Sequence, residues 1–312
     1  MGRCGGLLTL GLLAAVTLPA AAEGFAPRFE AGTTFVWGSA TELVLRDGTY
    51  NNPVSRLVWP VVPSLGLEFS VTLPWTAWTA TTLAAEGAFP LALGTMVDED
   101  WNTQTDSGYL VYGNSNQTAV QTSHWVVRAE QSFPWQEWTF SAGLLYRLTS
   151  WDGWNGSGTY QYSSYSQSWD FQGLIISYRQ EWFIPYLGAA WTWKGQGWTA
   201  VPSVRFSPYT WCFDSDSHYY PTYGSEVSAT HVFLDSTSGG VYAQGAIEVS
   251  FPAGPWSWGL RGAWEIAWGS VGSTVNTLSY QNGPGVSQSY STASQSAGAW
   301  FQELSMSVFI RN

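Results

Sequence analysis

Charged residues are scarce in this sequence, and basic residues are the scarcest. Only 11% of the 312 residues are charged, against about 25% in an ordinary globular chain. The 11 Lys and Arg stand against 22 Asp and Glu, which gives a formal net charge of -11. Because phosphate recognition starts from clustered Lys and Arg, we expect no nucleic-acid partner. The 45% of apolar residues excludes a disordered chain. Because a folded chain with so few charges cannot cover its whole surface with them, we expect part of the surface to face a non-aqueous environment.

Long apolar runs are absent beyond the N-terminus. Arg3 precedes the apolar stretch Leu7–Leu18, and small residues follow up to Ala22, which is the pattern of a secretory signal peptide. We therefore predict a signal peptide over residues 1–22 and one mature, exported domain over residues 23–312. No later apolar run approaches the roughly 20 residues of a membrane-spanning helix.

Cysteine and histidine are also rare, with 2 Cys and 3 His in the chain. Cys4 lies in the predicted signal peptide, so Cys212 is left without an intrachain disulfide partner. Neither His124 nor His231 stands at zinc-ligand spacing from His218. We therefore expect no disulfide, no metal and no cofactor.

Apolar and polar residues alternate with a period of two, which predicts strands. The pattern is clear in residues 64–73, 138–148, 241–251 and 256–268. A soluble sandwich would carry many more charges on its outer face. An outer-membrane barrel instead turns apolar side chains to lipid and polar ones to the lumen, with aromatic girdles at both interfaces. We therefore predict an all-β transmembrane barrel, with a soluble sandwich as the alternative.

Proline followed by an aromatic residue predicts the number of strands, because Pro in sheets is largely confined to edges and turns. The segments are Leu73-Pro74-Trp75, Phe133-Pro134-Trp135, Ile184-Pro185-Tyr186 and Phe251–Trp256. Taken as four short periplasmic turns, they predict a ten-stranded antiparallel barrel with long extracellular loops. The polar stretches 102–122, 155–169, 214–228 and 276–297 are then these loops, and the sheet is expected to project beyond the bilayer on the loop side.

One polar segment could carry histidine chemistry. Alternate residues share one face of a strand, so Asp214, Asp216 and His218 can all point into the lumen. An Asp beside a His orients the ring and stabilises its protonated form, which equips the ring to act as a general base on water.

A second acidic cluster contains Asp98 and Asp100, which also share one face. Two close carboxylates resist ionising together, so one can hold a proton while the pair positions a water. With Asn102 they imitate the opening of a calcium loop, but Thr103 and Tyr109 replace the Gly and the Glu that such a loop needs. The midpoints between the predicted turns place both clusters at the outer end of the barrel.

Together, in this order and topology, the two clusters resemble the omptin family of outer-membrane endoproteases. Met96–Trp101 matches the family's Met-Val-Asp-x-Asp-Trp segment, and Asp214–Tyr219 matches its Asp-x-Asp-x-His-Tyr segment. The resemblance implies an aspartate/histidine-type endopeptidase whose site, in an outward cleft of a ten-stranded barrel, activates water. It assigns the catalytic roles to Asp98, Asp100, Asp216 and His218.

The same resemblance implies a pocket for a basic side chain on the amino side of the cut bond. It assigns Glu42, Asp214 and Met96 to this pocket, and two confined carboxylates favour an Arg guanidinium. Expected partners are therefore basic peptides or proteins and the lipid of a Gram-negative-type outer membrane, with the site facing outside. Ser150 and Glu181 replace basic residues that hold lipopolysaccharide in some relatives, which puts a lipopolysaccharide requirement in doubt.

Two other functions remain open on the sequence. A non-enzymatic barrel, either an adhesin or a small pore, would explain the alternation but would make the coincidence of the two clusters accidental. A lipid-modifying barrel enzyme would be expected to carry a Ser-His pair on its outer wall.

Overall fold

The structure is a computed structural model that describes residues 26–46, 53–105, 108–223, 227–281 and 287–312. The strands are β1 (Arg28–Leu45), β2 (Pro53–Thr76), β3 (Thr79–Pro90), β4 (Gly94–Thr105), β5 (Gly108–Trp135), β6 (Trp138–Tyr162), β7 (Ser166–Trp191), β8 (Trp193–Gly195), β9 (Trp198–Ser207), β10 (Trp211–Tyr223), β11 (Val227–Ser238), β12 (Gly240–Ala253), β13 (Trp256–Gly269), β14 (Gly272–Gln281) and β15 (Ser287–Arg311). Within these ranges no helix is long and apolar enough to cross a membrane. The predicted signal peptide, residues 1–22, lies outside the described residues.

Several of these elements are parts of one longer strand. Short breaks at residues 91–93, 208–210, 239 and 270–271 separate β3 from β4, β9 from β10, β11 from β12 and β13 from β14. The short β8 continues β7 after Thr192. Counted in this way, the described residues form ten long strands, and every recorded strand pairing is antiparallel. The predicted ten-stranded antiparallel architecture is therefore confirmed.

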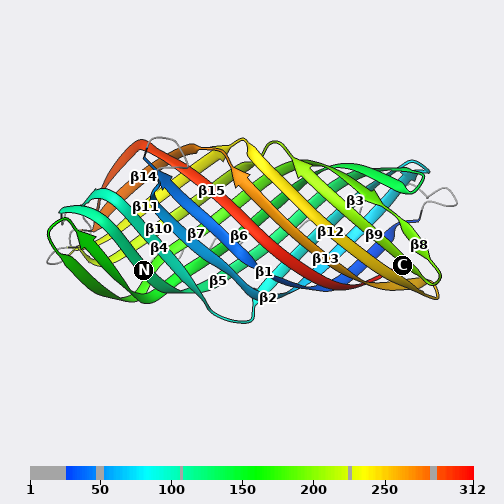
Figure 1. Cartoon of the computed structure of the whole chain (residues 1–312), viewed down its shortest axis with the longest axis horizontal. Coiled ribbons are helices and arrows are strands. Elements are labelled where there is room, and N and C mark those ends of the chain that lie inside the picture. The colour runs from blue at the N-terminus through cyan, green and yellow to red at the C-terminus, as the bar shows by residue number, and fades with distance from the viewer. Residues whose placement is uncertain (1–25, 47–52, 106–107, 224–226, 282–286) are drawn as a thin grey trace.

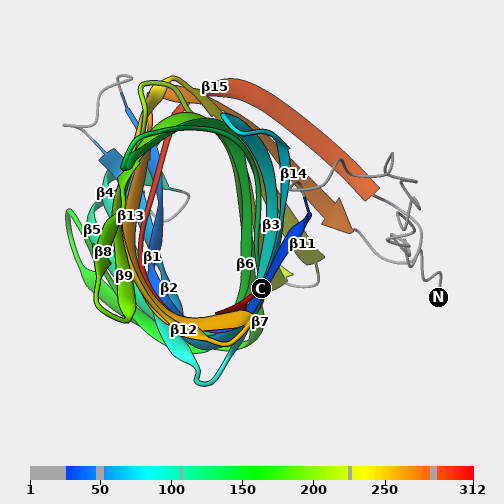
Figure 2. The ribbon, with the colours of Figure 1, turned by 90° about the vertical axis from the view of Figure 1, so that its right-hand side faces the viewer.

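Pairing between the first and last strands closes the sheet into a barrel. The β1–β15 ladder runs from the pair Glu30–Arg311 to the pair Leu45–Ser296. Figure 1 shows the strands strongly tilted along an elongated molecule, and Figure 2 shows the closed, oval ring seen from one end. A closed ring leaves no strand edge with unpaired backbone groups.

Short turns join the strands at one end of the barrel, at residues 77–78, 136–137, 196–197 and 254–255. The predicted turn at Ile184-Pro185-Tyr186 is wrong, because Pro185 pairs with Leu144 inside the β6–β7 ladder. On its other side, β7 pairs with β10 up to Phe183 and with β9 from Leu187. Pro185 thus faces the break between β9 and β10, where no ladder needs the N–H that proline lacks.

The polar stretches predicted as loops are largely strand. Ladder pairs such as Asn114–Thr159 and Asn276–Thr292 continue the sheet through them. Strand β5 has 28 residues and β6 has 25, against the roughly 9 to 11 that a strand needs to cross a bilayer. The sheet therefore extends well past a membrane thickness, as expected, but as paired strand rather than as open loop.

Large apolar side chains are exposed on the outside of the barrel, mainly on the half near the short turns. They include Leu67, Phe69, Leu83, Phe89, Val127, Leu187, Val204, Ile247, Leu260 and Val308, with Trp75, Trp78, Trp135, Trp193 and Trp256 beside the turns. Such a band with an aromatic girdle is the lipid-facing surface of a membrane barrel, so the soluble-sandwich alternative is wrong. Strands β4, β10, β11 and β14 continue β3, β9, β12 and β13 beyond this band.

The lumen on the turn side is polar and filled by ion pairs. Arg147 is 2% exposed, lies 2.6 Å from Glu265, also pairs with Glu303, and stacks 4.1 Å from the ring centroid of Phe301. A cavity of about 330 Å³ beside this network is lined by further Arg and Glu side chains, including Arg261. Charged groups that would be costly facing lipid are thus paired inside the ring.

Replacing Arg147 with Met is expected to destabilise the barrel by about 3–5 kcal/mol, because Glu265 and Glu303 would be left buried without their cation. The free energy of unfolding in detergent micelles, measured by urea titration, tests this. Lys194→Met at the exposed β8 segment is the matched control. A change at Arg147 no larger than that control would show that the network adds nothing to stability.

Candidate active site

Strand register places the first acidic cluster inside the barrel. Leu57 of β2 pairs with Glu42 of β1 on one side and with Asp98 of β4 on the other, so the three side chains form one row across the sheet. Asp100, two residues further, pairs with Ser55 and points the same way. The row faces the lumen, because Glu42 and Leu57 are 1% and 2% exposed.

The second cluster lies on β10, where alternate residues also point inward. Asp214 and Asp216 are buried, whereas Phe213, directly before Asp214, is exposed on the outer wall. His218 Nε2 lies 2.5 Å from Asp216 Oδ2, and the His218 side chain is 21% exposed. The predicted Asp-His couple is therefore formed by a direct hydrogen bond, with the ring reachable from solvent.

The two clusters act on one another electrostatically. Burial lowers the pKa of His218, but the carboxylates of Asp216, Asp98 and Asp100 outweigh this effect and raise it to about 9. Burial, with repulsion from Asp100, raises the pKa of Asp98 well above its usual value. Burial also raises the pKa of Asp100, although the Ser55 hydrogen bond opposes the shift. The imidazole therefore keeps its proton at neutral pH, and the Asp98–Asp100 pair ionises less readily than isolated carboxyls do.

Hydrogen bonds around Asp98 leave part of its carboxylate without a protein partner. Ser115 Oγ lies 3.5 Å from Asp98 Oδ2, at the limit of a hydrogen bond. Asp98 Oδ1 is buried and has no hydrogen-bond partner among the described residues. Buried polar atoms are usually satisfied, so this oxygen is suited to hold a water or a substrate group.

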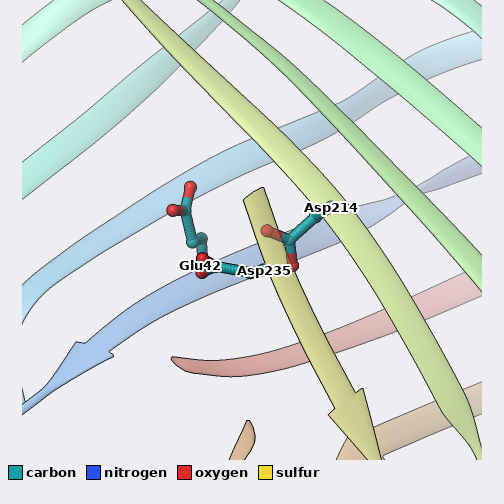
Figure 3. A group of neighbouring side chains, drawn as sticks. All are labelled: Glu42, Asp214 and Asp235. Carbon is teal, nitrogen blue, oxygen red and sulfur yellow. The ribbon is translucent and has the colours of Figure 1, made fainter. Parts of the chain in front are cut away.

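Three further carboxylates meet beside these clusters. Oxygens of Glu42, Asp214 and Asp235 all lie within 4.8 Å of one another, and all three residues are buried. Figure 3 shows them reaching into one space from β1, β10 and β11. Glu42 and Asp214, predicted to share a pocket, are thus brought together across the barrel.

Sequence reasoning missed Asp235, which stands opposite Asp214 in the β10–β11 ladder. It also missed that His231 stands opposite His218 in the same ladder. Both pairings depend on the register of the hairpin whose tip, residues 224–226, the structure leaves undescribed. Without that register, nothing distinguishes Asp235 from an ordinary strand residue.

Aromatic side chains form a layer below the carboxylates. Trp59 stacks at 5.5 Å on Tyr178 and at 5.9 Å on Trp151. Tyr178 pairs with Asp216 in the β7–β10 ladder, which places this layer directly beside the site. Met96 is fully buried two residues before Asp98 and belongs to the same apolar cluster, which suits the predicted pocket wall.

Three further residues singled out in the sequence are Cys212, Glu181 and Ser150, and their recorded contacts are to other side chains of the barrel. Cys212 is a buried free thiol whose Sγ lies 3.8 Å from Asp214 Oδ2. Glu181 binds Arg179 at 2.8 Å and accepts a hydrogen bond from Tyr146 at 2.6 Å. Ser150 bonds only to neighbouring hydroxyls in the recorded contacts. Glu181, an acid, thus stands at a position where some relatives were expected to carry a basic residue that contacts lipopolysaccharide.

The ten strands and the lipid-facing band define an outer-membrane β-barrel, and acidic and histidine side chains gather in its lumen. The Omptin family model matches residues 28–311, and the chain belongs to this family. It is therefore an outer-membrane endopeptidase.

Individual relatives agree with this assignment. The chain is 24% identical over 220 residues to the plasminogen activator of Yersinia pestis, covering 68% of this chain and 70% of that protein. The outer membrane protease OmpT from Escherichia coli superposes with a TM-score of 0.74 at 15% identity, covering 91% of this chain and 95% of that structure. At that identity, the superposition shows a shared fold.

The His218 ring is expected to titrate near pH 9, because three carboxylates surround it. Changing Asp216 to Asn removes the closest of them and should lower the pKa of His218. Histidine-selective NMR of the refolded barrel measures both values, with His218→Gln used to assign the signal. A parent ring that titrates at or below its ordinary 6.5 would contradict the charge arrangement described above.

Proposed function

We propose that this endopeptidase cuts next to basic residues by using a water molecule that Asp98 and His218 activate. The observation that carries the proposal is the 2.5 Å Asp216–His218 bond inside a barrel whose opposite wall presents Asp98 and Asp100. No covalent acyl-enzyme is needed, because the nucleophile is the water.

The proposed reaction moves one proton from water to the leaving amine. His218 accepts the water proton on Nδ1, since Nε2 is bound to Asp216 Oδ2. The water oxygen attacks the peptide carbonyl carbon, and the imidazolium then donates its proton to the departing nitrogen as the C–N bond breaks. Asp216 stabilises the imidazolium during this exchange, as a buried acid does beside a catalytic His.

Asp98 and Asp100 are proposed to hold the water as a pair. Because the pKa of each is raised, one of the two carboxyls keeps a proton while the other ionises. Such a pair can accept a hydrogen bond from the water and donate one to the oxyanion that develops on the carbonyl. Asp100 thereby tunes the protonation of Asp98.

The pocket formed by Glu42 and Asp214 is proposed to bind the basic side chain on the amino side of the cut bond, with Met96 as part of its wall. Both carboxylates are buried, and a guanidinium would supply the countercharge. A neutral side chain would leave these charges unpaired, which is the basis for discrimination.

The site is proposed to face the outside of the cell. The paired strand ends at Glu30 and Arg311 and the four short turns lie at the opposite end from β4, β10, β11 and β14. Bacterial barrels place their short turns in the periplasm. Because Ser150 and Glu181 offer no cationic contact to a lipid phosphate, we propose that activity does not require lipopolysaccharide.

Cleavage of a quenched peptide containing Arg-Arg tests the proposed function. Parent barrel should cut it, while His218→Ala and Asp98→Asn should each lose about 10²- to 10⁴-fold in rate, the usual contribution of general acid–base groups. Asp170→Asn, an exposed acid on β7, serves as the matched control and should keep full activity. A folded parent that cuts nothing, with or without added lipid, would favour the adhesin or pore instead.

The rate is expected to rise with pH up to about 9. His218 must be neutral to accept a proton, and its raised pKa of about 9 keeps most of it charged at pH 7, so kcat/KM should increase about tenfold per pH unit below that value. Asp216→Asn should move this limb to lower pH while lowering the maximum. A profile that is flat between pH 6 and 9 in the parent would show that His218 is not the base.

A further inference from the structure

The pocket of Glu42, Asp214 and Asp235 contains more carboxylates than one basic side chain can balance. The three residues are 1%, 7% and 4% exposed. Among the described residues, no Lys, Arg or His forms an ion pair with any of them. One bound guanidinium would leave two carboxylates in excess if all three were ionised, whereas a divalent ion would leave one.

Each of the three carboxylates has one oxygen that lacks a protein partner. Glu42 Oε2, Asp214 Oδ1 and Asp235 Oδ2 are buried and accept no hydrogen bond from the described part of the chain. The opposite oxygens of the two aspartates are occupied, since Thr274 Oγ1 donates to Asp235 Oδ1 at 2.6 Å and Cys212 lies beside Asp214 Oδ2. Buried carboxylate oxygens left in this way are costly unless a cation reaches them.

The three carboxylates share one environment, because their oxygens lie within 4.8 Å of one another and like charges this close repel. Burial, followed by repulsion from Asp216 and Asp214, raises the pKa of Glu42. Burial and repulsion from Asp235 raise the pKa of Asp214, and burial raises the pKa of Asp235 to about 7. A bound cation would remove this repulsion.

The spacing of the oxygens allows one cation to contact all three residues. Two ligands of one ion are separated by at most twice the metal–oxygen distance, which is about 4.6–5.2 Å for Ca²⁺ and about 4.2 Å for Mg²⁺. One oxygen from each of the three residues lies within 4.8 Å of the others, which is close enough for one Ca²⁺ ion to reach all three. An all-oxygen set also favours a hard cation over zinc or copper.

We propose that Glu42, Asp214 and Asp235 form a binding site for a divalent cation of the calcium class. Its position in the pocket assigned above to the basic side chain makes the ion and that side chain mutually exclusive. The competition rests on the proposed function, whereas the binding of the ion does not. Asp235 is the ligand that the two-carboxylate pocket expected from the sequence does not contain.

Terbium, a luminescent stand-in for calcium, tests the site directly in the refolded, full-length barrel. Tyr178 interacts electrostatically with Asp214 and Glu42 and stacks on Trp59, so excitation of these rings should sensitise a bound Tb³⁺. We expect saturable emission that Ca²⁺ displaces, with affinity at least tenfold weaker in Glu42→Gln and in Asp235→Asn. Circular dichroism and resistance of the folded barrel to SDS establish that each variant is folded.

Two matched carboxylate-to-amide controls locate the ion. Glu137→Gln, at an exposed short turn, and Asp98→Asn, in the catalytic pair, should both keep terbium binding. Emission that survives unchanged in folded Glu42→Gln and Asp235→Asn, or that disappears only in Asp98→Asn, would overturn the proposal. Absence of any saturable emission from the parent, together with no effect of Ca²⁺ on its thermal unfolding, would overturn it equally.

A kinetic measurement separates this proposal from the proposed function. Ca²⁺ should raise KM for the Arg-Arg peptide in proportion to its concentration and leave kcat unchanged, and this effect should weaken in Asp235→Asn relative to that variant's own activity. A parent that binds terbium but cuts no peptide would keep the ion site and remove the protease. A parent that cuts the peptide but binds no terbium would keep the protease and refute the ion site. A fall in kcat with KM unchanged would show that the ion and the basic side chain do not compete for one pocket.

Discussion

Closure of the sheet between β1 and β15 is the constraint on which the rest of the structure depends. A lipid environment offers no partner to backbone N–H and C=O groups, so an open edge there would be costly. The ladder from Glu30–Arg311 to Leu45–Ser296 removes that edge. Across the lumen, β1 meets β7, because Gln180 donates from Nε2 to the carbonyl oxygen of Thr41 at 3.3 Å. Gln180 stands opposite Asp214 in the β7–β10 ladder, so β1 also lies near the acids of β10 and β11.

The interior of the ring provides two different surroundings for charge. On the turn side, Arg147 and Arg261 neutralise the glutamates that share the lumen with them. Beyond the aromatic layer of Trp59, Trp151 and Tyr178, the recorded cation of Asp98, Asp100 and Asp216 is His218. Charges that are paired stabilise the barrel, whereas those that lack a partner are available to water, substrate or metal.

Much of the fold could be predicted, because membrane strands repeat one simple pattern. Apolar residues at every second position predicted both the strands and the lipid-facing side, and three of four turns lie within a few residues of the proline segments. Pro185 misled the prediction because its missing N–H faces a break between β9 and β10 that no local pattern reveals. The polar stretches were taken for loops because composition does not distinguish a solvated strand from a loop.

The two proposed catalytic couples could be predicted from the sequence alone, because the period of a strand places Asp98 with Asp100 and Asp216 with His218 wherever the strands lie. Their meeting in one site, and the addition of Asp235 to Glu42 and Asp214, was decided only by the tertiary structure. Glu42 and Asp214 are far apart in the chain, and Asp235 reaches them through the register of one hairpin. Such long-range neighbours depend on ring closure and ladder register, which are properties of the whole sheet and leave no mark in any single segment.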